Sequence, residues 1–171
     1  MRWRTHRAHP ALPPPGAFLL SCRRHTSHVA LRLANVYGPR QSSGLEGGVV
    51  AIFLERMETS EPTVIFGDGS QVRDFVFVGD VVDALLAAAG GSGGPFNIGT
   101  GTETSVGALH AACAAVAGVP DAPAHAGARL GDVHRSVLDA SRAARELGWQ
   151  PRVPLEDGLA RTWAWMRQEA L

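Results

Sequence analysis

Residues 63–78 read Thr63-Val-Ile-Phe-Gly-Asp-Gly-Ser-Gln-Val-Arg-Asp-Phe-Val-Phe-Val78. This segment contains two short apolar runs separated by a polar, glycine-containing stretch. Thr63–Phe66 predicts a strand, which the turn Gly67-Asp68-Gly69 ends. Asp74–Val78 predicts a second strand of β-branched and aromatic residues. Two strands so close together place a sheet at the centre of this part of the chain.

The same reading extends in both directions along the sequence. Further strands are predicted at Val29–Val36, Pro95–Ile98 and Arg135–Leu138. A helix is predicted at Gly48–Met57, with Val49, Ile52, Phe53 and Met57 on its buried face. Further helices are predicted from Asp80 as N-cap through Ala89, from Ser105 onward, at Ala140–Leu147 with Asp139 as N-cap and Gly148 as stop, and after Pro154. Because strands alternate with helices, the fold class is α/β or α+β.

Composition indicates an ordinary globular domain. The chain has 171 residues, of which 45% are hydrophobic and 19% charged, so a packed core is expected. Acidic and basic residues balance at 16 each, which argues against general attraction to nucleic acid or anionic lipid. No apolar run approaches the roughly 18–20 residues that span a bilayer. We therefore expect a cytoplasmic protein with no nucleic-acid or membrane partner.

Two residue types important for catalysis are absent or rare. Every basic residue is an arginine, and Tyr37 is the single tyrosine. The lack of lysine excludes Schiff bases, a Walker lysine and a Tyr-x-x-x-Lys pair, so no catalytic residue is predicted. The spacing of Cys22, His25 and His28 resembles half of a metal site, but a structural zinc ion needs four ligands. No metal site is predicted.

The first 28 residues differ from the rest in composition and in apolar periodicity. They contain many arginines and histidines, a triple proline and no apolar periodicity, and the first acidic residue of the chain is Glu46. Residues 1–28 are therefore predicted to be a basic leader without a core of its own. Residues 29–171 are predicted to form the folded domain.

Two glycine motifs begin like a dinucleotide-binding loop. They are Gly67-Asp-Gly-Ser-Gln-Val72 and Gly99-Thr-Gly-Thr-Glu-Thr104. A dinucleotide loop needs glycine or alanine at its sixth position for close packing of helix and strand, whereas valine and threonine stand there. Both motifs are predicted to be turns.

A set of polar residues lies at the ends of the predicted strands. Asn35 stands where the chain turns, Arg73 precedes a strand, and Arg129 and Asp132 flank a glycine corner. Two guanidinium groups and a carboxylate suit a diphosphate joined to a ribose. Alternatively, Asn35 caps its turn and the charged residues form ordinary surface pairs. Spacing alone favours this second interpretation.

Taken in order, six segments resemble the C-terminal portion of the NAD-dependent epimerase/dehydratase family, the extended short-chain dehydrogenases, and most closely its UDP-glucose 4-epimerase-like members. They are Leu31-Arg-Leu-Ala-Asn-Val-Tyr-Gly-Pro-Arg-Gln41, Gly48-Val-Val-Ala-Ile-Phe53, Phe66-Gly-Asp-Gly-Ser-Gln-Val-Arg-Asp-Phe-Val-Phe-Val78, Phe96-Asn-Ile-Gly-Thr-Gly101, Arg129-Leu-Gly-Asp132 and Glu146-Leu-Gly-Trp-Gln-Pro151. Their order and spacing are family-like over residues 29–171. The resemblance implies an α/β fold and raises the ligand interpretation above the surface-pair one.

The resemblance also implies a set of binding residues. Asn35, Arg73 and Arg129 would contact the diphosphate of a UDP-sugar, and Asp132 its ribose. Val64 and Phe66 would lie on the strand whose edge holds the uracil. The segment Leu33–Ala34 lies where the family approaches the nicotinamide of NAD, its cofactor. Family members are commonly homodimers.

The sequence departs from the family at its start. The resemblance implies a Rossmann half with the cofactor loop and the Tyr-x-x-x-Lys pair, and residues 1–28 match neither. Tyr37 cannot replace that tyrosine, because Gln41 stands at the lysine position. A truncated, catalytically incomplete epimerase is the leading hypothesis, in which Val29–Leu33 presents an unpaired apolar edge. A stand-alone nucleotide-sugar binding module is the alternative, and a nucleic-acid binder that uses the leader is the weakest.

Overall fold

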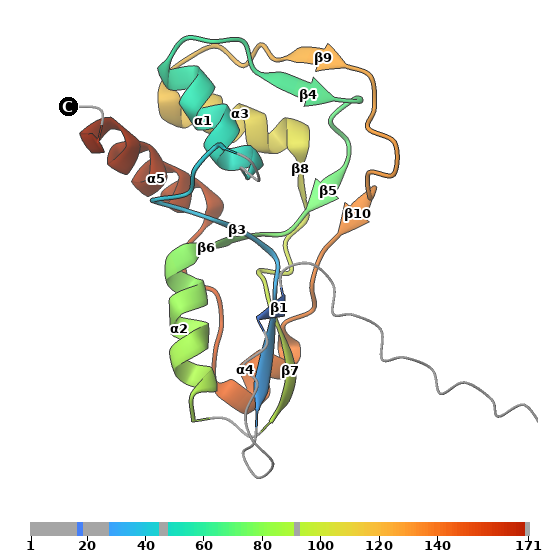
Figure 1. Ribbon diagram of the computed structural model, residues 1–171, viewed down its shortest axis with the longest axis vertical. Helices are drawn as coiled ribbons and strands as arrows, with labels where there is room; N and C mark the ends of the chain where they lie inside the picture. The colour runs from blue at the N-terminus through green and yellow to red at the C-terminus, as the bar shows by residue number, and fades with distance from the viewer. Residues whose placement is uncertain (1–16, 19–27, 45–47, 91–92, 170–171) are drawn as a thin grey trace, which may run out of the picture.

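The computed structural model describes residues 17–18, 28–44, 48–90 and 93–169. Its strands are β1 (Ala17–Phe18), β2 (Val29–Leu33), β3 (Asn35–Tyr37), β4 (Val64–Phe66), β5 (Val72–Arg73), β6 (Phe75–Phe77), β7 (Gly94–Ile98), β8 (Thr104–Ser105), β9 (Ala124–Ala126) and β10 (Arg135–Ser136). Its helices are α1 (Val49–Glu58), α2 (Val78–Ala88), α3 (Val106–Ala117), α4 (Ser141–Leu147) and α5 (Leu155–Glu169). Figure 1 shows these elements in an elongated molecule of two lobes.

The lower lobe in Figure 1 is built on the sheet β1-β2-β7, with α2 and α4 beside it. Strand β2 pairs in parallel with β7 along its whole length, from Val29 to Leu33. The prediction that this segment presents an unpaired edge is wrong in part, because β1 pairs with Leu31 and Arg32 on the other side. A strand edge carries free backbone N–H and C=O groups and accepts any segment that can satisfy them. Here the added strand comes from within the predicted leader.

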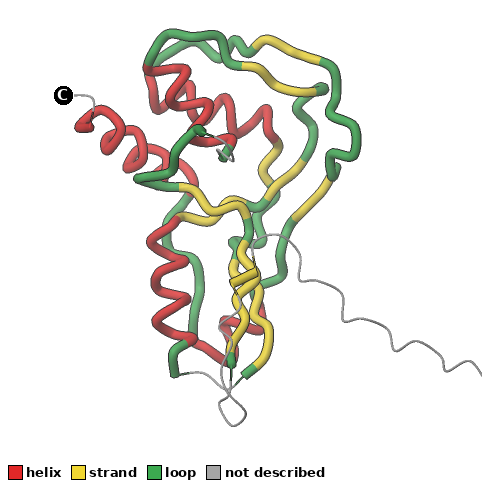
Figure 2. Tube along the Cα trace, in the orientation of Figure 1, coloured by secondary structure: helices red, strands yellow, loops and turns green. Residues whose placement is uncertain are grey.

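The upper lobe contains α1, α3 and α5, with the parallel pair β4–β9 along one side (Figure 2). The buried face of α1 differs from the prediction. Val50, Phe53, Leu54 and Met57 are buried, whereas Val49 and Ile52 are only half-buried. Helix α1 therefore has two apolar stripes. One packs into the core, and the second, which includes Val49 and Ile52, faces a cavity.

The two lobes are joined where extended segments change partners. The predicted strand Val29–Val36 is in fact two strands, β2 and β3, separated at Ala34, whose N–H donates to the carbonyl of Ile98 at 2.8 Å. Strand β3 pairs with β6 rather than with β7. The predicted strand Asp74–Val78 is shorter, at Phe75–Phe77, and β5 precedes it. The strand predictions were therefore correct in type, but the first was wrong in continuity.

The start of α3 at Ser105 agrees with the prediction, whereas two predicted caps, Asp80 and Asp139, are corrected. The Ser105 hydroxyl accepts from the N–H of Ala108 at 3.1 Å, as expected of an N-cap. Asp80 does not cap α2, which begins at Val78; the buried Asp80 carboxylate instead accepts from the N–H groups of Arg152 and Val153. That carboxylate is turned toward the segment that precedes α5.

Helix α4 begins one residue later than predicted. Ala140 occupies the N-cap position, and the Asp139 carboxylate accepts from the N–H of Ser141 at 2.8 Å. This hydrogen bond lowers the pKa of Asp139. Gly148 ends the helix in the left-handed conformation, at φ 64°, as its position predicts.

None of the helices in the described ranges is both long enough and apolar enough to cross a membrane. The exposed large apolar residues include three on one side of α2, namely Val82, Leu85 and Leu86. This side of α2 is therefore an apolar patch exposed to water.

We predict that the folded protein loses stability at alkaline pH. Burial raises the pKa of the Cys113 thiol from 9.0 to about 12 and also raises that of the Tyr37 phenol. The unfolded chain ionises first as the pH rises. The stabilisation is therefore complete below about pH 9 and is lost toward pH 12. Urea unfolding at successive pH values measures this decline.

The matched variant is Cys113→Ala, which removes the buried thiol. Its free energy of unfolding should fall less steeply between pH 9 and pH 11 than that of the unmodified chain. Equal slopes for the two proteins would show that Cys113 contributes nothing to the alkaline transition.

Candidate functional site

A cavity of about 550 Å³ lies in the upper lobe between α1, β4, β5 and the loop that joins β9 to β10. All six residues that the sequence proposes for substrate binding line it, namely Asn35, Val64, Phe66, Arg73, Arg129 and Asp132. They come from positions up to almost a hundred residues apart in the sequence. Their convergence on one cavity makes this the candidate functional site.

Helix α1 forms one wall of this cavity. Val49, Ile52, Phe53 and Arg56 line it, at the spacing of three and four residues that places side chains on one helical face. At a rise of about 1.5 Å per residue, this stripe is about 10 Å long. The cavity is therefore elongated, with Gly48 at one end of the stripe and Arg56 at the other.

The strand β4 forms a second wall. Val64, Ile65 and Phe66 all line the cavity, but Ile65 is 2% exposed and belongs to the core, whereas Val64 and Phe66 are half-buried. This alternation is what a strand produces. The guanidinium of Arg129 lies over the ring of Phe66, with Cζ 3.9 Å from the ring centroid. Such a cation–π contact places Arg129 flat against the apolar wall.

Arg73 and Asp132 form an ion pair within the cavity. Arg73 Nη2 lies 2.5 Å from Asp132 Oδ1, and their side chains are 18% and 33% exposed. Arg73 belongs to β5, which pairs with β10, and the loop before β10 carries Asp132. Without ligand, the guanidinium of Arg73 is thus bound to an internal carboxylate. Any external anion must compete with Asp132 for it.

Asn35 lines the cavity and is also tied to the backbone. Its Nδ2 donates to the carbonyl oxygen of Asp74 at 3.2 Å, and its N–H donates to the same oxygen at 2.9 Å. The two interpretations of Asn35, turn residue and ligand residue, are therefore compatible. The backbone contacts orient the amide, whose oxygen has no protein partner among the described residues.

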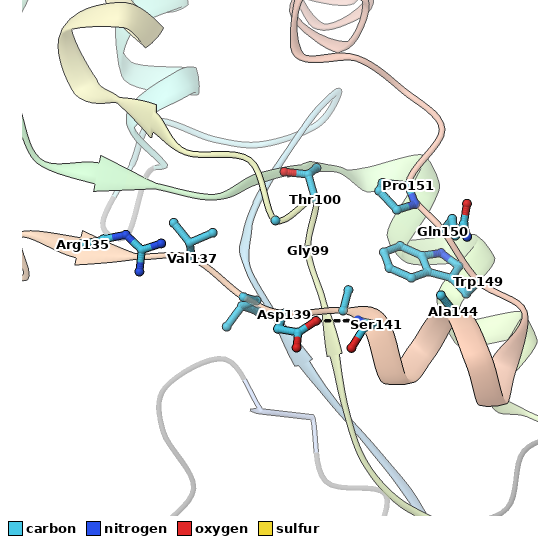
Figure 3. A pocket seen from close by; sticks show the side chains of 13 residues that line it. Gly99, Thr100, Arg135, Val137, Asp139, Ser141, Ala144, Trp149, Gln150 and Pro151 are labelled. Carbon is cyan, nitrogen blue, oxygen red and sulfur yellow. Dashed lines mark hydrogen bonds between the residues drawn. The ribbon is translucent and has the colours of Figure 1, made fainter.

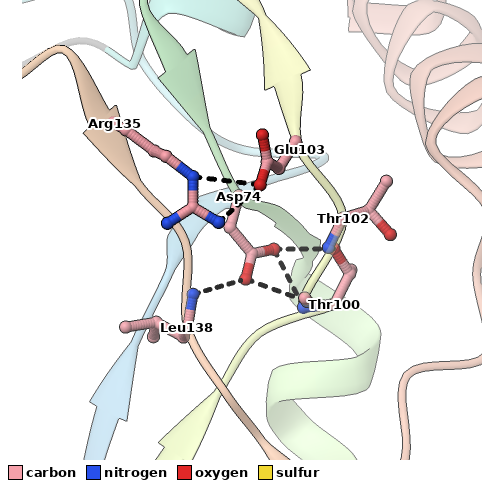
Figure 4. A network of polar contacts seen from close by, with 7 residues as sticks. Asp74, Thr100, Thr102, Glu103, Arg135 and Leu138 are labelled. Atoms are coloured by element: carbon pink, nitrogen blue, oxygen red, sulfur yellow. Dashed lines mark hydrogen bonds and ion pairs between the residues drawn. The ribbon is translucent and has the colours of Figure 1, made fainter.

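Asp74 positions the site but was not identified by the sequence analysis. The carboxylate is 1% exposed. It accepts from the N–H and hydroxyl of Thr100, at 2.8 and 2.7 Å, from the N–H of Gly101 at 3.1 Å, and from the N–H of Leu138 at 3.3 Å (Figure 4). Its own N–H donates to Ser136. One side chain thus joins the chain next to Arg73 to two other loops.

The sequence signal for this role is the glycine at position 99. A Cβ atom at Gly99 would lie 2.4 Å from Asp74 Oδ2, so only glycine fits beside the carboxylate. The motif Gly99-Thr-Gly101 is therefore a cradle for an internal carboxylate. Its backbone N–H groups are used by Asp74 and do not face a phosphate. Gly99 forms a bend and the chain stays irregular through Glu103, in agreement with the predicted turn.

The other glycine motif also does not fit a dinucleotide. It leads from β4 into β5, a strand and not a helix, as predicted. Leu33 and Ala34, the residues proposed for the cofactor, lie half-buried at the break between β2 and β3. In the Gly99 motif, the N–H groups of Thr100 and Gly101 are already bound to the Asp74 carboxylate.

A second cavity, of about 570 Å³, lies beside α4 (Figure 3). The turn at Gly99 and the segment around Trp149 line it. Two of its polar groups are bound to the protein: Arg135 pairs with Glu103, and the Trp149 indole N–H donates to the carbonyl of Asp80 at 2.8 Å. This cavity therefore offers fewer free groups to a charged ligand than the first one does.

Tyr37 is not placed as a catalytic base. It is 2% exposed, and its hydroxyl donates to the carbonyl of Leu155 at 3.2 Å. A Cβ atom at Gly158 would lie 2.0 Å from the hydroxyl oxygen, so α5 packs directly against it. Burial raises the pKa of the phenol, and the negative charges of Asp80 and Glu156 raise it further. Tyr37 is a core residue.

The chain is similar to known proteins over most of its length. The sequence model of the NAD dependent epimerase/dehydratase family matches residues 20–99, starting within the predicted leader. A UDP-glucose 4-epimerase of Mycolicibacterium smegmatis is 53% identical over 146 residues, which are 84% of this chain and 46% of that protein.

Solved structures show the same similarity. The UDP-glucose 4-epimerase of Thermotoga maritima with UDP-glucose has a TM-score of 0.80 and 47% identity, over 82% of this chain and 46% of that one. The Thermus thermophilus enzyme in complex with NAD has a TM-score of 0.72 and 40% identity, over 80% and 45%. The predicted family resemblance and the α/β fold are confirmed. The chain spans about half the length of the relatives it matches.

We predict that Asp74→Ala destabilises the protein by about 3 kcal/mol, because several buried donors lose their acceptor. Asp74→Asn should recover only part of this loss, since its amide N–H₂ would face backbone N–H groups. Urea unfolding monitored by circular dichroism measures both variants.

The matched control is Asp68→Ala. Asp68 is exposed, and among the described residues its carboxylate accepts only from Ser70. This substitution should change the unfolding midpoint little. If the Asp74 variants unfold at the same urea concentration as the control, the buried carboxylate does not hold the loops together.

Proposed function

We propose that this chain, which resembles the UDP-glucose 4-epimerases of the NAD-dependent epimerase/dehydratase family, binds a UDP-sugar in the cavity lined by α1 and β4 and corresponds to the substrate-binding part of such an enzyme. The observation that carries the proposal is the convergence of Asn35, Val64, Phe66, Arg73, Arg129 and Asp132 on that cavity. The similarity to a structure described with UDP-glucose supports the same ligand class.

The chemistry of the cavity suits a nucleoside diphosphate. Arg73 and Arg129 present planar guanidinium groups, which bind phosphate oxygens through paired N–H donors. Asp132 accepts from the hydroxyl groups of a ribose, and the apolar edge of β4 at Val64 and Phe66 packs against a base. When the diphosphate takes Arg73, the Asp132 carboxylate is released toward the ribose. One rearrangement thus serves both ligand groups.

The proposal assigns no catalytic step to this chain alone. In the family, NAD takes up and returns a hydride, and a tyrosine paired with lysine moves the proton. This sequence has no lysine, and its one tyrosine is buried in the core. We infer that NAD is not held by these residues alone, and that the role of Leu33 and Ala34 toward the nicotinamide requires a cofactor-binding unit. The alternative function is a nucleotide-sugar binding module without catalysis.

We predict that UDP binds and that Arg73→Ala and Arg129→Ala each weaken UDP about fivefold, as expected for a partly hydrated charge pair worth about 1 kcal/mol. Uridine should be affected little, because it has no phosphate to lose. Isothermal titration calorimetry or ligand-observed NMR measures the series. Equal losses for UDP and uridine would contradict the assignment of the arginines.

Asp132→Ala is expected to weaken uridine, whose ribose loses its acceptor. The same substitution frees Arg73 from its internal partner, so inorganic pyrophosphate should bind more tightly. A variant in which pyrophosphate binds no better would show that Asp132 does not compete with the ligand for Arg73.

We also predict that the purified chain does not convert UDP-galactose to UDP-glucose with added NAD. The physical reason is the missing Tyr-x-x-x-Lys pair, together with the use of the Thr100 and Gly101 N–H groups by Asp74. A coupled assay with an authentic epimerase as positive control checks this. Turnover that disappears in Tyr37→Phe would refute the assignment of Tyr37 to the core.

A further inference from the structure

Arg56 is a third arginine of the cavity, and it is not among the residues proposed above. It lies at the end of the α1 stripe, half-buried. Its Nη1 donates to the carbonyl oxygen of Pro62 at 2.7 Å. Pro62 is two residues before Val64, the first residue of β4. The guanidinium is therefore fixed beside the start of the strand that forms the apolar wall.

The three arginines of the cavity have different partners. Arg73 is bound to a carboxylate, and Arg129 lies over an aromatic ring. Arg56 donates to one neutral carbonyl, and among the described residues no carboxylate lies within ion-pair distance of it. A guanidinium has five N–H donors and no acceptor. Arg56 thus keeps donors available at the β4 end of the cavity.

The position of Arg56 relates it to one part of the ligand. If the diphosphate lies at Arg73 and Arg129 and the base packs on Val64 and Phe66, then Arg56 is next to the base. A group there that can only donate hydrogen bonds favours a ring carbonyl and disfavours a ring amino group. Uracil and cytosine differ at this point, since C4 bears a carbonyl oxygen in uracil and an amino group in cytosine.

We infer that Arg56 is a specificity-determining residue that selects a uracil base over cytosine by donating to its C4 carbonyl. The inference rests on the proposed function, because the base is placed by the diphosphate site. The anchoring bond to Pro62 holds the guanidinium in one orientation, which is what discrimination between two bases of equal size requires.

Calorimetric titration of UDP and CDP into the full chain tests the inference. The unmodified protein should bind UDP about tenfold more tightly than CDP, as expected of one hydrogen bond to a charged group. In Arg56→Met, which keeps the length but has no donor, the ratio should fall to about twofold or less. Arg56→Lys, which can still only donate, should keep a preference for UDP.

Two controls separate the role of Arg56 from general effects. Arg73→Ala should weaken UDP and CDP equally and leave their ratio unchanged, because both carry the same diphosphate. Arg145→Met, an exposed substitution on α4 outside the cavity, should change neither affinity. Circular dichroism melts establish that each variant is folded.

The possible outcomes separate the inference about Arg56 from the proposed function. UDP binding with no preference over CDP in the unmodified chain overturns the inference by itself, even if Arg56→Met fails to fold. An unchanged ratio in a folded Arg56→Met also overturns it and leaves the UDP site intact. If neither nucleotide binds and pyrophosphate does not bind either, the proposed function itself is refuted.

Discussion

The buried carboxylate of Asp74 is the constraint on which the arrangement of the site depends. It accepts hydrogen bonds from the turn after β7 and from the segment after β10, while its backbone oxygen holds Asn35. A buried carboxylate without these donors would be strongly unfavourable. The three segments therefore have to meet here. Because Arg73 directly precedes Asp74 in the chain, the same meeting point brings its guanidinium into the cavity.

The arginines of the proposed anion site already have partners within the protein. Arg73 forms an ion pair with Asp132, and the guanidinium of Arg129 lies over the ring of Phe66. These contacts offset the positive charge of two guanidinium groups that line one cavity. Under the proposed function, a diphosphate would replace the Asp132 contact of Arg73. Affinity would then reflect an exchange of partners rather than a simple addition of charge.

The two lobes contribute differently to function. The upper lobe contains the candidate site and a core in which Tyr37 and Cys113 are buried. The lower lobe is a small parallel sheet extended by β1, with an apolar surface on α2 that includes Leu86, 70% exposed. In the family, catalysis joins a substrate site to a cofactor site. The described residues place the proposed substrate residues around one cavity, while two N–H groups of the Gly99 motif are used by Asp74.

The sequence by itself determined the element types and the family resemblance, and through that resemblance it named six of the residues that line the cavity, because motifs such as Arg73-Asp74 and Arg129-Leu-Gly-Asp132 are contiguous in the chain. Local patterns also predicted that a helix opens at Ser105, where the cap bond needs only neighbouring residues. Tertiary structure alone decided that Val29–Val36 divides into two strands, that Asp80 serves a distant segment and that Arg56 faces the ligand cavity. These features depend on partners far away in the sequence, and local periodicity contains no information about which distant group will satisfy a buried donor or acceptor.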